Sequence, residues 1–172
     1  MAGHCVDAVF GHTILMQFSD LDPVLAEVKR VLKPGGLVGF REMDFGASLY
    51  HSDTSALREA RSILRRVTLH NDGNPDLGRV LPGILAHAGF EILSAVATFG
   101  CPPTPQAKAR LYGVTAQLWE QGEFVAQAEA LGWIDAAGRS AMLERLKREG
   151  ADPASFSGMA HAEVVARMVT LE

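Results

Sequence analysis

The chain has little cysteine: among 172 residues only Cys5 and Cys101 occur. Two cysteines so far apart in sequence do not make a disulfide framework, and neither has the neighbours of a metal site. The histidines His4, His70, His87 and His161 share no metal-ligand spacing either, so we expect no bound metal. This cysteine usage is typical of a reducing compartment, and we expect a cytoplasmic protein.

Long apolar runs and an excess of basic residues are also missing. No segment approaches the ~18 apolar residues needed to cross a bilayer, and the first residues, MAGHCVDAVF, lack the pattern of a signal peptide. The net charge of −4 argues against nucleic acid or an acidic membrane as the main partner. No GxSxG elbow is present, which argues against a serine hydrolase.

What is present is a clear strand–helix–strand pattern in the first forty residues. VDAVF (6–10) predicts a buried strand, and LVGF (37–40) predicts a strand buried on both faces. Between them, Asp22 can cap a helix whose first position suits Pro23, and the helix stops at Pro34–Gly36. Its apolar stripe contains Val24, Val28, Val31 and Leu32. These elements predict a right-handed βαβ unit.

Polar residues follow both strands of this unit. Open α/β sheets bind ligands beyond the carboxyl ends of their parallel strands, so Phe10–Met16 and Arg41–Phe45 should lie side by side on one rim. There His12 could accept a proton from a hydroxyl or an amine. Glu42 and Asp44 could orient a reacting group or could simply cap the loop.

The rest of the chain predicts further helices and strands. SDTSALREARSILRRVTLH (52–70) reads as a helix that Asp53 can cap, and its arginines predict a solvated face. A helix over Leu77–Ala88, kinked near Pro82, precedes a strand over 90–99. Helical patterns then occupy 106–121, 123–131 and 135–149, before a loop over 148–156 and a last strand over Ala162–Val169. The arginines of the first helix are Arg58, Arg61, Arg65 and Arg66.

Three segments of this sequence resemble one family. VDAVFGHTILMQFSDLDPVLAEVKRVLKPGGLVGFREMD (6–44) is similar to the middle of class I S-adenosylmethionine-dependent methyltransferases. LGRVLPGILAHAGFEIL (77–93) resembles a later helix and strand, and SFSGMAHAEVVARMV (155–169) the closing strand. The resemblance implies an α/β fold: a partial Rossmann-like sheet of parallel strands plus one antiparallel closing strand. It divides the chain into a core (1–100), a helical insertion (101–154) and the closing strand (155–172).

The resemblance also implies a function and a site. It implies S-adenosylmethionine as cofactor and a small-molecule methyl acceptor, with catalytic roles for His12, Glu42 and Asp44. Cofactor contacts would come from Phe10, Gly11, His12, Thr13 and Met16. The acceptor pocket would be lined by Arg41, Tyr50, Tyr112 and Trp119, although single aromatic residues at helical spacing more often belong to a core.

One departure from the family pattern is large. The family's acidic residue and GxGxG loop after its first strand have no counterpart, because Gly35, Gly36 and Gly39 precede a strand and read as a turn. The strand Val6–Phe10 thereby loses its usual neighbour, so we expect a second copy or a partner chain to cover it, or a rearranged strand.

Three functional hypotheses follow from this pattern. The first is a methyltransferase that is truncated or is completed by a partner chain. The second is a non-catalytic binding or scaffold subunit. The third is a repurposed, cofactor-independent enzyme such as a cyclase.

Overall fold

The computed structural model describes residues 3–169, which form two compact units. The sheet unit comprises 3–47, 72–99 and 160–169 of the described residues, and the helical unit comprises 48–71 and 100–159. These units cut the chain differently from the expected boundaries at 100 and 154, because the segment 48–71 groups with the later helices. Each unit is described by itself.

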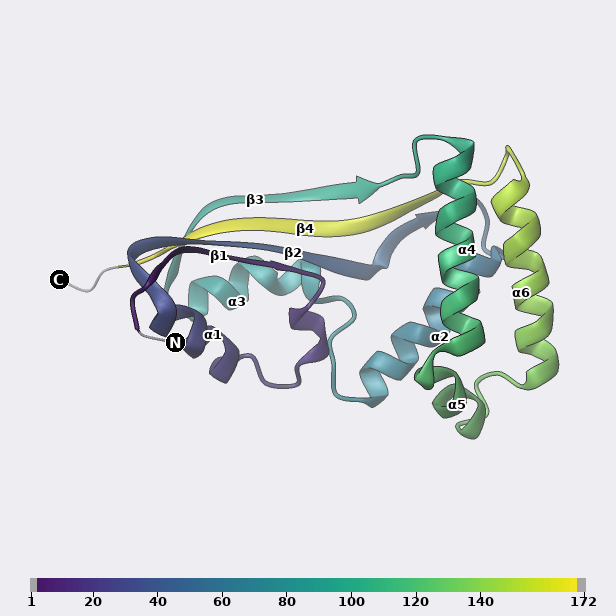
Figure 1. The fold of residues 1–172 in the computed structure, drawn as a ribbon, viewed down its shortest axis with the longest axis horizontal. Coiled ribbons are helices and arrows are strands. Elements are labelled where there is room, and N and C mark those ends of the chain that lie inside the picture. Colours follow the sequence, from purple (N-terminus) through teal and green to yellow (C-terminus); the bar gives the residue numbers. More distant parts are fainter. Residues whose placement is uncertain (1–2, 170–172) are drawn as a thin grey trace. The chain divides into compact units, whose positions relative to one another are not determined.

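Four strands form one mixed sheet in the order β1-β2-β4-β3 (Figure 1). β1 and β2 are parallel, with Phe10 opposite Gly39 and His12 opposite Arg41. In Figure 1 the chain runs one way along β2 and β3 and returns along β4. The expected sheet of parallel strands with one antiparallel closing strand is thus confirmed. The strands are β1 (Val6–His12), β2 (Leu32–Tyr50), β3 (Phe90–Gly100) and β4 (Ser157–Met168).

The βαβ unit is confirmed, with corrections at the ends of its helix. α1 (Asp22–Val31) includes Asp22 as its first residue, and the Asp22 side chain makes no cap hydrogen bond. Instead the Asp22 N–H donates to Asp20 Oδ1 at 3.0 Å. β2 begins at Leu32, directly after the helix, and its register to β1 shifts between Val6 and Ala8. Gly35 lies in this irregular stretch with φ +74, a conformation that glycine adopts without strain.

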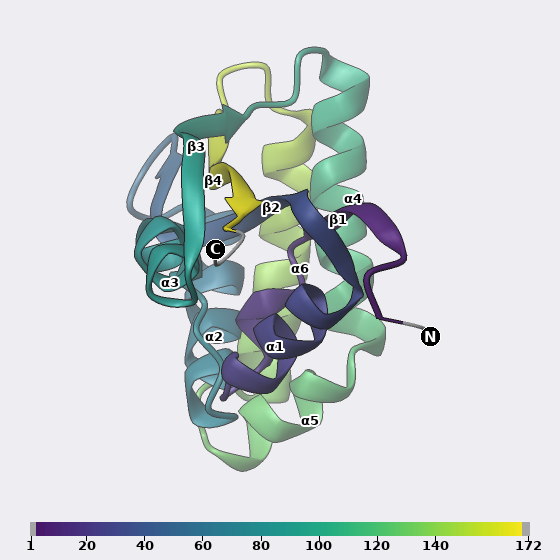
Figure 2. The same ribbon diagram turned by 90° about the vertical axis from the view of Figure 1, so that its left-hand side faces the viewer.

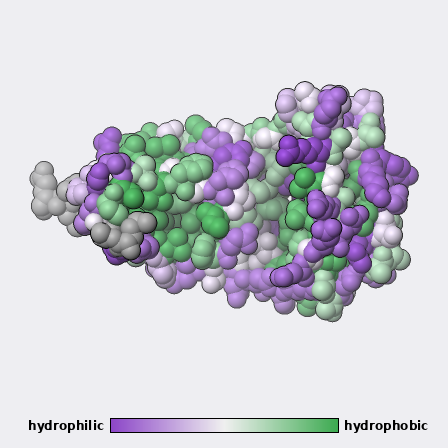
Figure 3. Space-filling view, in the orientation of Figure 1, coloured by the Kyte–Doolittle hydropathy of each residue, from purple (hydrophilic) through white to green (hydrophobic). Residues whose placement is uncertain are grey.

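Only one face of the sheet is covered by helices of its own unit. α1 and α3 (Leu81–His87) lie on the same side of the sheet in Figures 1 and 2, and Val38 and Phe40 are buried there. On the opposite face Leu37 is 39% exposed and Phe10 is 74% exposed. The predictions of a buried first strand and of a second strand buried on both faces were therefore wrong. Apolar residues reach the surface of this unit in the space-filling view (Figure 3).

The helix expected over Leu77–Ala88 is divided in two. Residues Leu77–Val80 form a 3₁₀ helix, and α3 starts at Leu81, with Pro82 in its first turn. Proline lacks the N–H that an inner helical position would use, so the break falls where the kink was expected. Gly89 follows with φ +81 and turns the chain into β3.

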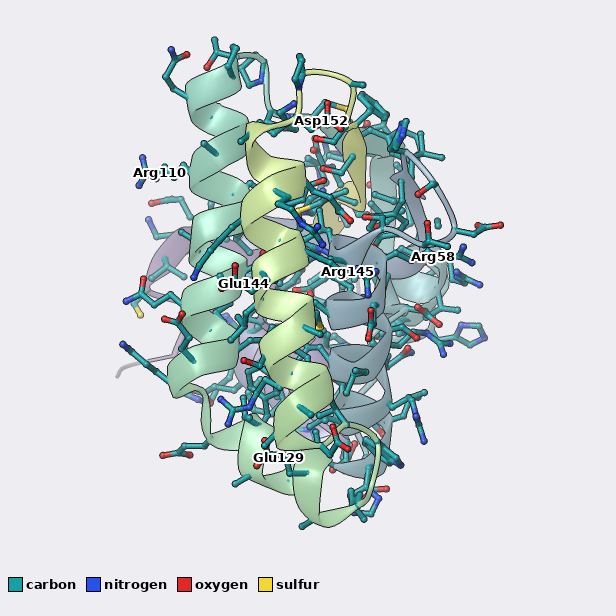
Figure 4. The ribbon with its side chains drawn as sticks, turned by 90° about the vertical axis from the view of Figure 1, so that its right-hand side faces the viewer. Arg58, Arg110, Glu129, Glu144, Arg145 and Asp152 are labelled. Atoms are coloured by element: carbon teal, nitrogen blue, oxygen red, sulfur yellow. The ribbon has the colours of Figure 1, made fainter. Side chains whose placement is uncertain are left out.

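The helical unit contains the three helices predicted between 106 and 149, and α2 packs with them (Figure 4). α6 continues into the segment expected to be a loop, and β4 starts at Ser157, earlier than the predicted Ala162. The arginine face is corrected as well, since Arg61 is 9% exposed. The helices are α2 (Ala56–His70), α4 (Pro105–Gln121), α5 (Glu123–Ala130) and α6 (Ala136–Ala151).

The start of α2 is capped from another helix. Asp53, the predicted cap, pairs with Arg58 and makes no bond to the helix amides. The Glu149 carboxylate of α6 accepts the Ala56 N–H at 2.6 Å and the Ser55 hydroxyl at 2.9 Å. A carboxylate is favourable there because the first amides of a helix lack partners within it.

Candidate functional site

The two segments expected to meet at the carboxyl rim do meet, but Arg41–Phe45 lies within β2, which continues to Tyr50, and does not form a loop after the strand. The Thr13 N–H donates to the Arg41 carbonyl at 2.8 Å, which continues the β1–β2 pairing past the end of β1. A 3₁₀ turn at Leu15–Gln17 follows and folds the chain back under the sheet. Leu15 and Met16 are buried in this turn, whereas His12 and Ile14 are exposed.

Glu42 fixes this loop from the neighbouring strand. It is fully buried, and its Oε1 accepts the N–H groups of both Ile14 and Leu15 at 3.0 Å. Among the described residues its second oxygen, Oε2, has no hydrogen-bond partner. One side chain thereby pairs both amides at the start of the turn. Of the two roles considered for Glu42, loop capping is the one that the contacts show.

Asp44 is likewise engaged in the rim. Its two oxygens accept from Arg79 at 2.7 and 2.6 Å, a bidentate pair, and Oδ1 also accepts the Ala47 N–H at 2.9 Å. The pair raises the pKa of Arg79, chiefly through the hydrogen bond to Asp44. Gly46 lets the guanidinium approach, because a Cβ there would lie 2.7 Å from an Arg79 nitrogen.

A third segment, unassigned in the sequence analysis, completes the rim. The Asn74 N–H donates to the Met16 carbonyl at 3.0 Å, and the Phe45 N–H donates to the Pro75 carbonyl at 3.2 Å. The turn cluster NDGNP (71–75) predicts a loop, yet nothing in its composition shows which strand end it contacts. Arg79 was missed for the same reason.

Of the three predicted catalytic side chains, His12 is the one that is exposed to solvent. Its ring stacks on that of His161 with centroids 6.2 Å apart. Beside it, Arg41 donates to Glu163 at 2.9 Å, and Thr98 donates to the same oxygen at 2.7 Å. These two hydrogen bonds lower the pKa of the Glu163 carboxyl. Arg41, predicted to line a substrate pocket, therefore forms part of a polar network across β1, β2, β4 and β3.

The residues predicted to contact a cofactor fall into two groups. Phe10 and His12 are exposed and Thr13 is half-buried, with φ +51. Gly11 and Met16 are buried, and a Cβ on Gly11 would lie 2.6 Å from the Phe40 ring. Gly11 is thus required by the packing of β1 on β2, and Met16 belongs to the core.

The other predicted pocket residues belong to the helical unit. Tyr112 and Trp119 are 2% and 1% exposed and lie in the helical core, with Trp119 edge-on to Phe124. Tyr50 packs against the same core, and burial raises the pKa of its hydroxyl. The buried Arg61 interacts electrostatically with both tyrosines and donates to Met159 Sδ at 2.9 Å. Arg61 was assigned to a solvated face because helical periodicity does not tell which arginine turns inward.

Metal-binding and membrane-spanning features were also sought in the part of the chain that the structure describes. Residues 3–169 contain no group of three or more histidine, cysteine, aspartate or glutamate side chains placed to hold a metal ion. None of the described helices is long and apolar enough to span a membrane.

Comparison with known proteins supports the resemblance at the rim and in the fold. Residues 1–40 match the family model of the methyltransferase domain. None of the curated proteins matches the sequence. Among solved structures, the [4+2]-cyclase SpnF matches with a TM-score of 0.52 at 21% identity, over 99% of this chain and 53% of its own.

Two further solved structures are similar. A proposed methyltransferase from Bacillus halodurans C-125 matches with a TM-score of 0.50 at 14% identity, over 99% of this chain and 67% of its own. Phosphoethanolamine N-methyltransferase 2 of Haemonchus contortus, in complex with S-adenosyl-L-methionine, matches with a TM-score of 0.47 at 15% identity. The match covers 98% of this chain and 34% of that protein.

The chain therefore has a partial Rossmann-like α/β fold similar to that of SpnF and of the Bacillus halodurans protein. Residues 1–40, which contain β1 and most of the βαβ unit, carry the sequence pattern of the methyltransferase-domain family. The chain spans about half the length of SpnF.

The rim residues fit one side of a cofactor such as S-adenosylmethionine. Phe10 and His12 present exposed aromatic surface on the open face of the sheet, on which a planar ring such as a purine can stack, whereas Ile14 lies on the other side, beside Gly11. Both rim carboxylates already hold protein groups, Glu42 two backbone amides and Asp44 a guanidinium. The described residues thus offer a stacking surface.

Proposed function

We propose that this chain takes part in S-adenosylmethionine-dependent transfer of a methyl group to a small molecule. We further propose that the remainder of the cofactor site comes from a polypeptide segment outside residues 3–169. The supporting observation is the rim itself: Glu42 holds the Ile14 and Leu15 amides within the segment that bears the family pattern.

Each rim residue has a defined part in this proposal. The cofactor supplies a methyl group activated on a sulfonium sulfur. Phe10, His12 and Thr13 bind and orient it, while Glu42 and the Asp44–Arg79 pair keep their loop in place. Methyl transfer depends mostly on in-line positioning, so His12 is needed as a proton acceptor only for a hydroxyl or similar acceptor.

The first test is calorimetric titration of the purified chain with S-adenosylmethionine and with its demethylated product. We expect weak binding that is lost in His12→Ala and retained in His87→Ala. His87 is a matched control because it is also an exposed histidine of the sheet unit, on α3. Absence of heat at millimolar ligand would show that the chain by itself does not bind the cofactor.

A cofactor-independent reaction, such as a cyclisation, is the alternative. The support for it is that SpnF, described as a [4+2]-cyclase, shares this fold with a TM-score of 0.52. A chain that binds neither methyltransferase ligand but binds an apolar polyene would favour the alternative. A chain that binds none of these compounds would favour a non-catalytic scaffold.

A further inference from the structure

A buried arginine of the helical unit carries an inference that rests on the proposed function and deepens it. Arg61 on α2 is nine-tenths buried, and this burial lowers the pKa of its guanidinium. A buried cation is costly unless an anion balances its charge. The hydrogen bond from Arg61 to Met159 Sδ goes to a thioether, which is a weak acceptor and carries no charge.

Two tyrosines interact electrostatically with Arg61. They are Tyr50 at the end of β2 and Tyr112 on α4. Burial raises the pKa of both hydroxyls above the ordinary value for tyrosine, so both are neutral at pH 7. A neutral hydroxyl can donate a hydrogen bond to an anion, but it does not balance the charge of a buried guanidinium.

A buried serine lies in the same part of the helical unit. Ser157, the first residue of β4, is buried, and its Oγ has no hydrogen-bond partner among residues 3–169. The hydroxyls of Ser157 and Tyr112 are near enough to influence each other, although they make no hydrogen bond of normal geometry. Buried hydroxyls are nearly always hydrogen-bonded. The Ser157 hydroxyl therefore indicates the position of an atom that the described residues do not supply.

Two other buried or half-buried charges of this unit already hold protein groups. Glu149 accepts two hydrogen bonds at the start of α2, and Lys108 donates to the carbonyls of Asp152 and Ser155. A charged ligand would therefore be balanced by Arg61. One guanidinium balances one negative charge, which favours a carboxylate over a phosphate dianion.

We propose that the helical unit binds a carboxylate group of the methyl acceptor, with Arg61 as its counter-ion and the hydroxyls of Tyr112 and Ser157 as hydrogen-bond donors. A planar carboxylate can accept two N–H groups of one guanidinium, which fixes its orientation as well as its position. The substrate class is thus a small organic acid with a single negative charge.

Tyr50 gives the ligand a way in and connects the site to the rim. Its side chain is only partly buried, whereas those of Arg61, Tyr112 and Ser157 are buried, so the ligand enters past Tyr50. Tyr50 is also the last residue of β2, the strand that carries Glu42. The same strand runs from the rim into the anion site, and for this reason we identify the ligand as the methyl acceptor.

Binding of benzoate to the purified chain, measured by ligand-observed nuclear magnetic resonance, tests the proposal. Benzamide has the same shape without the charge, and we expect it to bind at least about tenfold more weakly than benzoate. Arg61→Met removes the charge at similar side-chain length and should weaken benzoate binding by about tenfold or more. Arg66→Met is the matched control, because Arg66 is an exposed arginine of the same helix that stacks on Trp133, and it should bind benzoate as the wild type does.

Thermal denaturation separates a binding role of Arg61 from a structural one. An apolar side chain of similar volume is often neutral or stabilising in place of a buried charge, so Arg61→Met should melt no lower than the wild type without ligand. Benzoate should raise the melting temperature of the wild type and not that of Arg61→Met. Ser157→Ala keeps the charge and should weaken benzoate binding about two- to tenfold, the loss expected for one hydrogen bond.

Three results would each overturn the proposal. They are equal binding of benzoate and benzamide, unchanged benzoate binding in Arg61→Met, and no binding of benzoate to the wild type. If Arg61→Met does not fold, the comparison of benzoate with benzamide and the Ser157→Ala variant decide. No S-adenosylmethionine is used, so cofactor binding without benzoate binding would overturn this inference and leave the proposed function standing. Benzoate binding without cofactor binding would uphold the anion site and count against the proposed function.

Discussion

Oε1 of Glu42 accepts the N–H of Leu15 at 3.0 Å, which joins the middle of β2 to the turn that follows β1. The same oxygen accepts the N–H of Ile14. Glu42 is a carboxylate of the kind that suggests catalysis, and these two contacts make it the anchor of the loop.

Removal of this anchor should be costly, and its conservative replacement much less so. Glu42→Ala leaves the buried Leu15 amide and the part-buried Ile14 amide unpaired. An unpaired buried amide costs roughly 1–3 kcal/mol and a part-buried one less, so we expect a loss of about 2–4 kcal/mol in the free energy of unfolding. Glu42→Gln keeps an acceptor oxygen and should lose about 1 kcal/mol. Urea denaturation measures both. Equal losses in the two variants would contradict the prediction, because an acceptor oxygen at this position would then not be what holds the loop.

A methyl group on Gly11 should strain the β1–β2 contact. The added Cβ would lie 2.6 Å from the Phe40 ring, and overpacking of this kind costs roughly 1–3 kcal/mol. Gly39→Ala is the matched control, because its Cβ would meet Phe10 at an ordinary 3.4 Å. Thermal denaturation should show a lower midpoint for Gly11→Ala, and Phe40→Leu should partly restore it. If Gly11→Ala and Gly39→Ala behaved alike, the close approach would not matter.

The cap of α2 is testable against the residue that the sequence suggested. Glu149→Ala should lower the free energy of unfolding by about 0.5–2 kcal/mol, the range of helix N-cap losses. Asp53→Ala should change the free energy of unfolding by less than about 0.5 kcal/mol, because Asp53 forms only a solvent-exposed ion pair with Arg58. A larger loss for Asp53→Ala than for Glu149→Ala would show that Asp53, and not Glu149, caps α2.

Acid should weaken the polar network on the open sheet face through Glu163. Its pKa is lowered in the folded protein by Thr98 and Arg41, so its stabilising effect is present above the unfolded pKa, roughly 4.3. That effect is lost as pH falls through the lower, folded value. The difference in melting temperature between the wild type and Glu163→Gln should therefore shrink from pH 7 to pH 3. A constant difference would indicate that the carboxyl titrates normally.

Local patterns in the sequence predicted the elements and the rim, whereas long-range contacts decided the roles of the rim residues. Proline, glycine and apolar spacing suffice for the βαβ unit, and strand polarity then places Gly11–Met16 beside Arg41–Phe45. These local patterns carry no information on contacts between residues distant in sequence, such as Asp44 with Arg79 or Arg41 with Glu163. Burial of Arg61 was missed because a helix face with four arginines reads as solvated until the packing of α2 is known.

The cap that Glu149 provides for α2 also has a consequence for the order of folding. The Ala56 amide and the carboxylate that accepts it are 93 positions apart in sequence. During synthesis the first turn of α2 therefore leaves the ribosome long before its cap exists. A nascent chain that ends before α6 therefore lacks the carboxylate that accepts this amide in the folded protein.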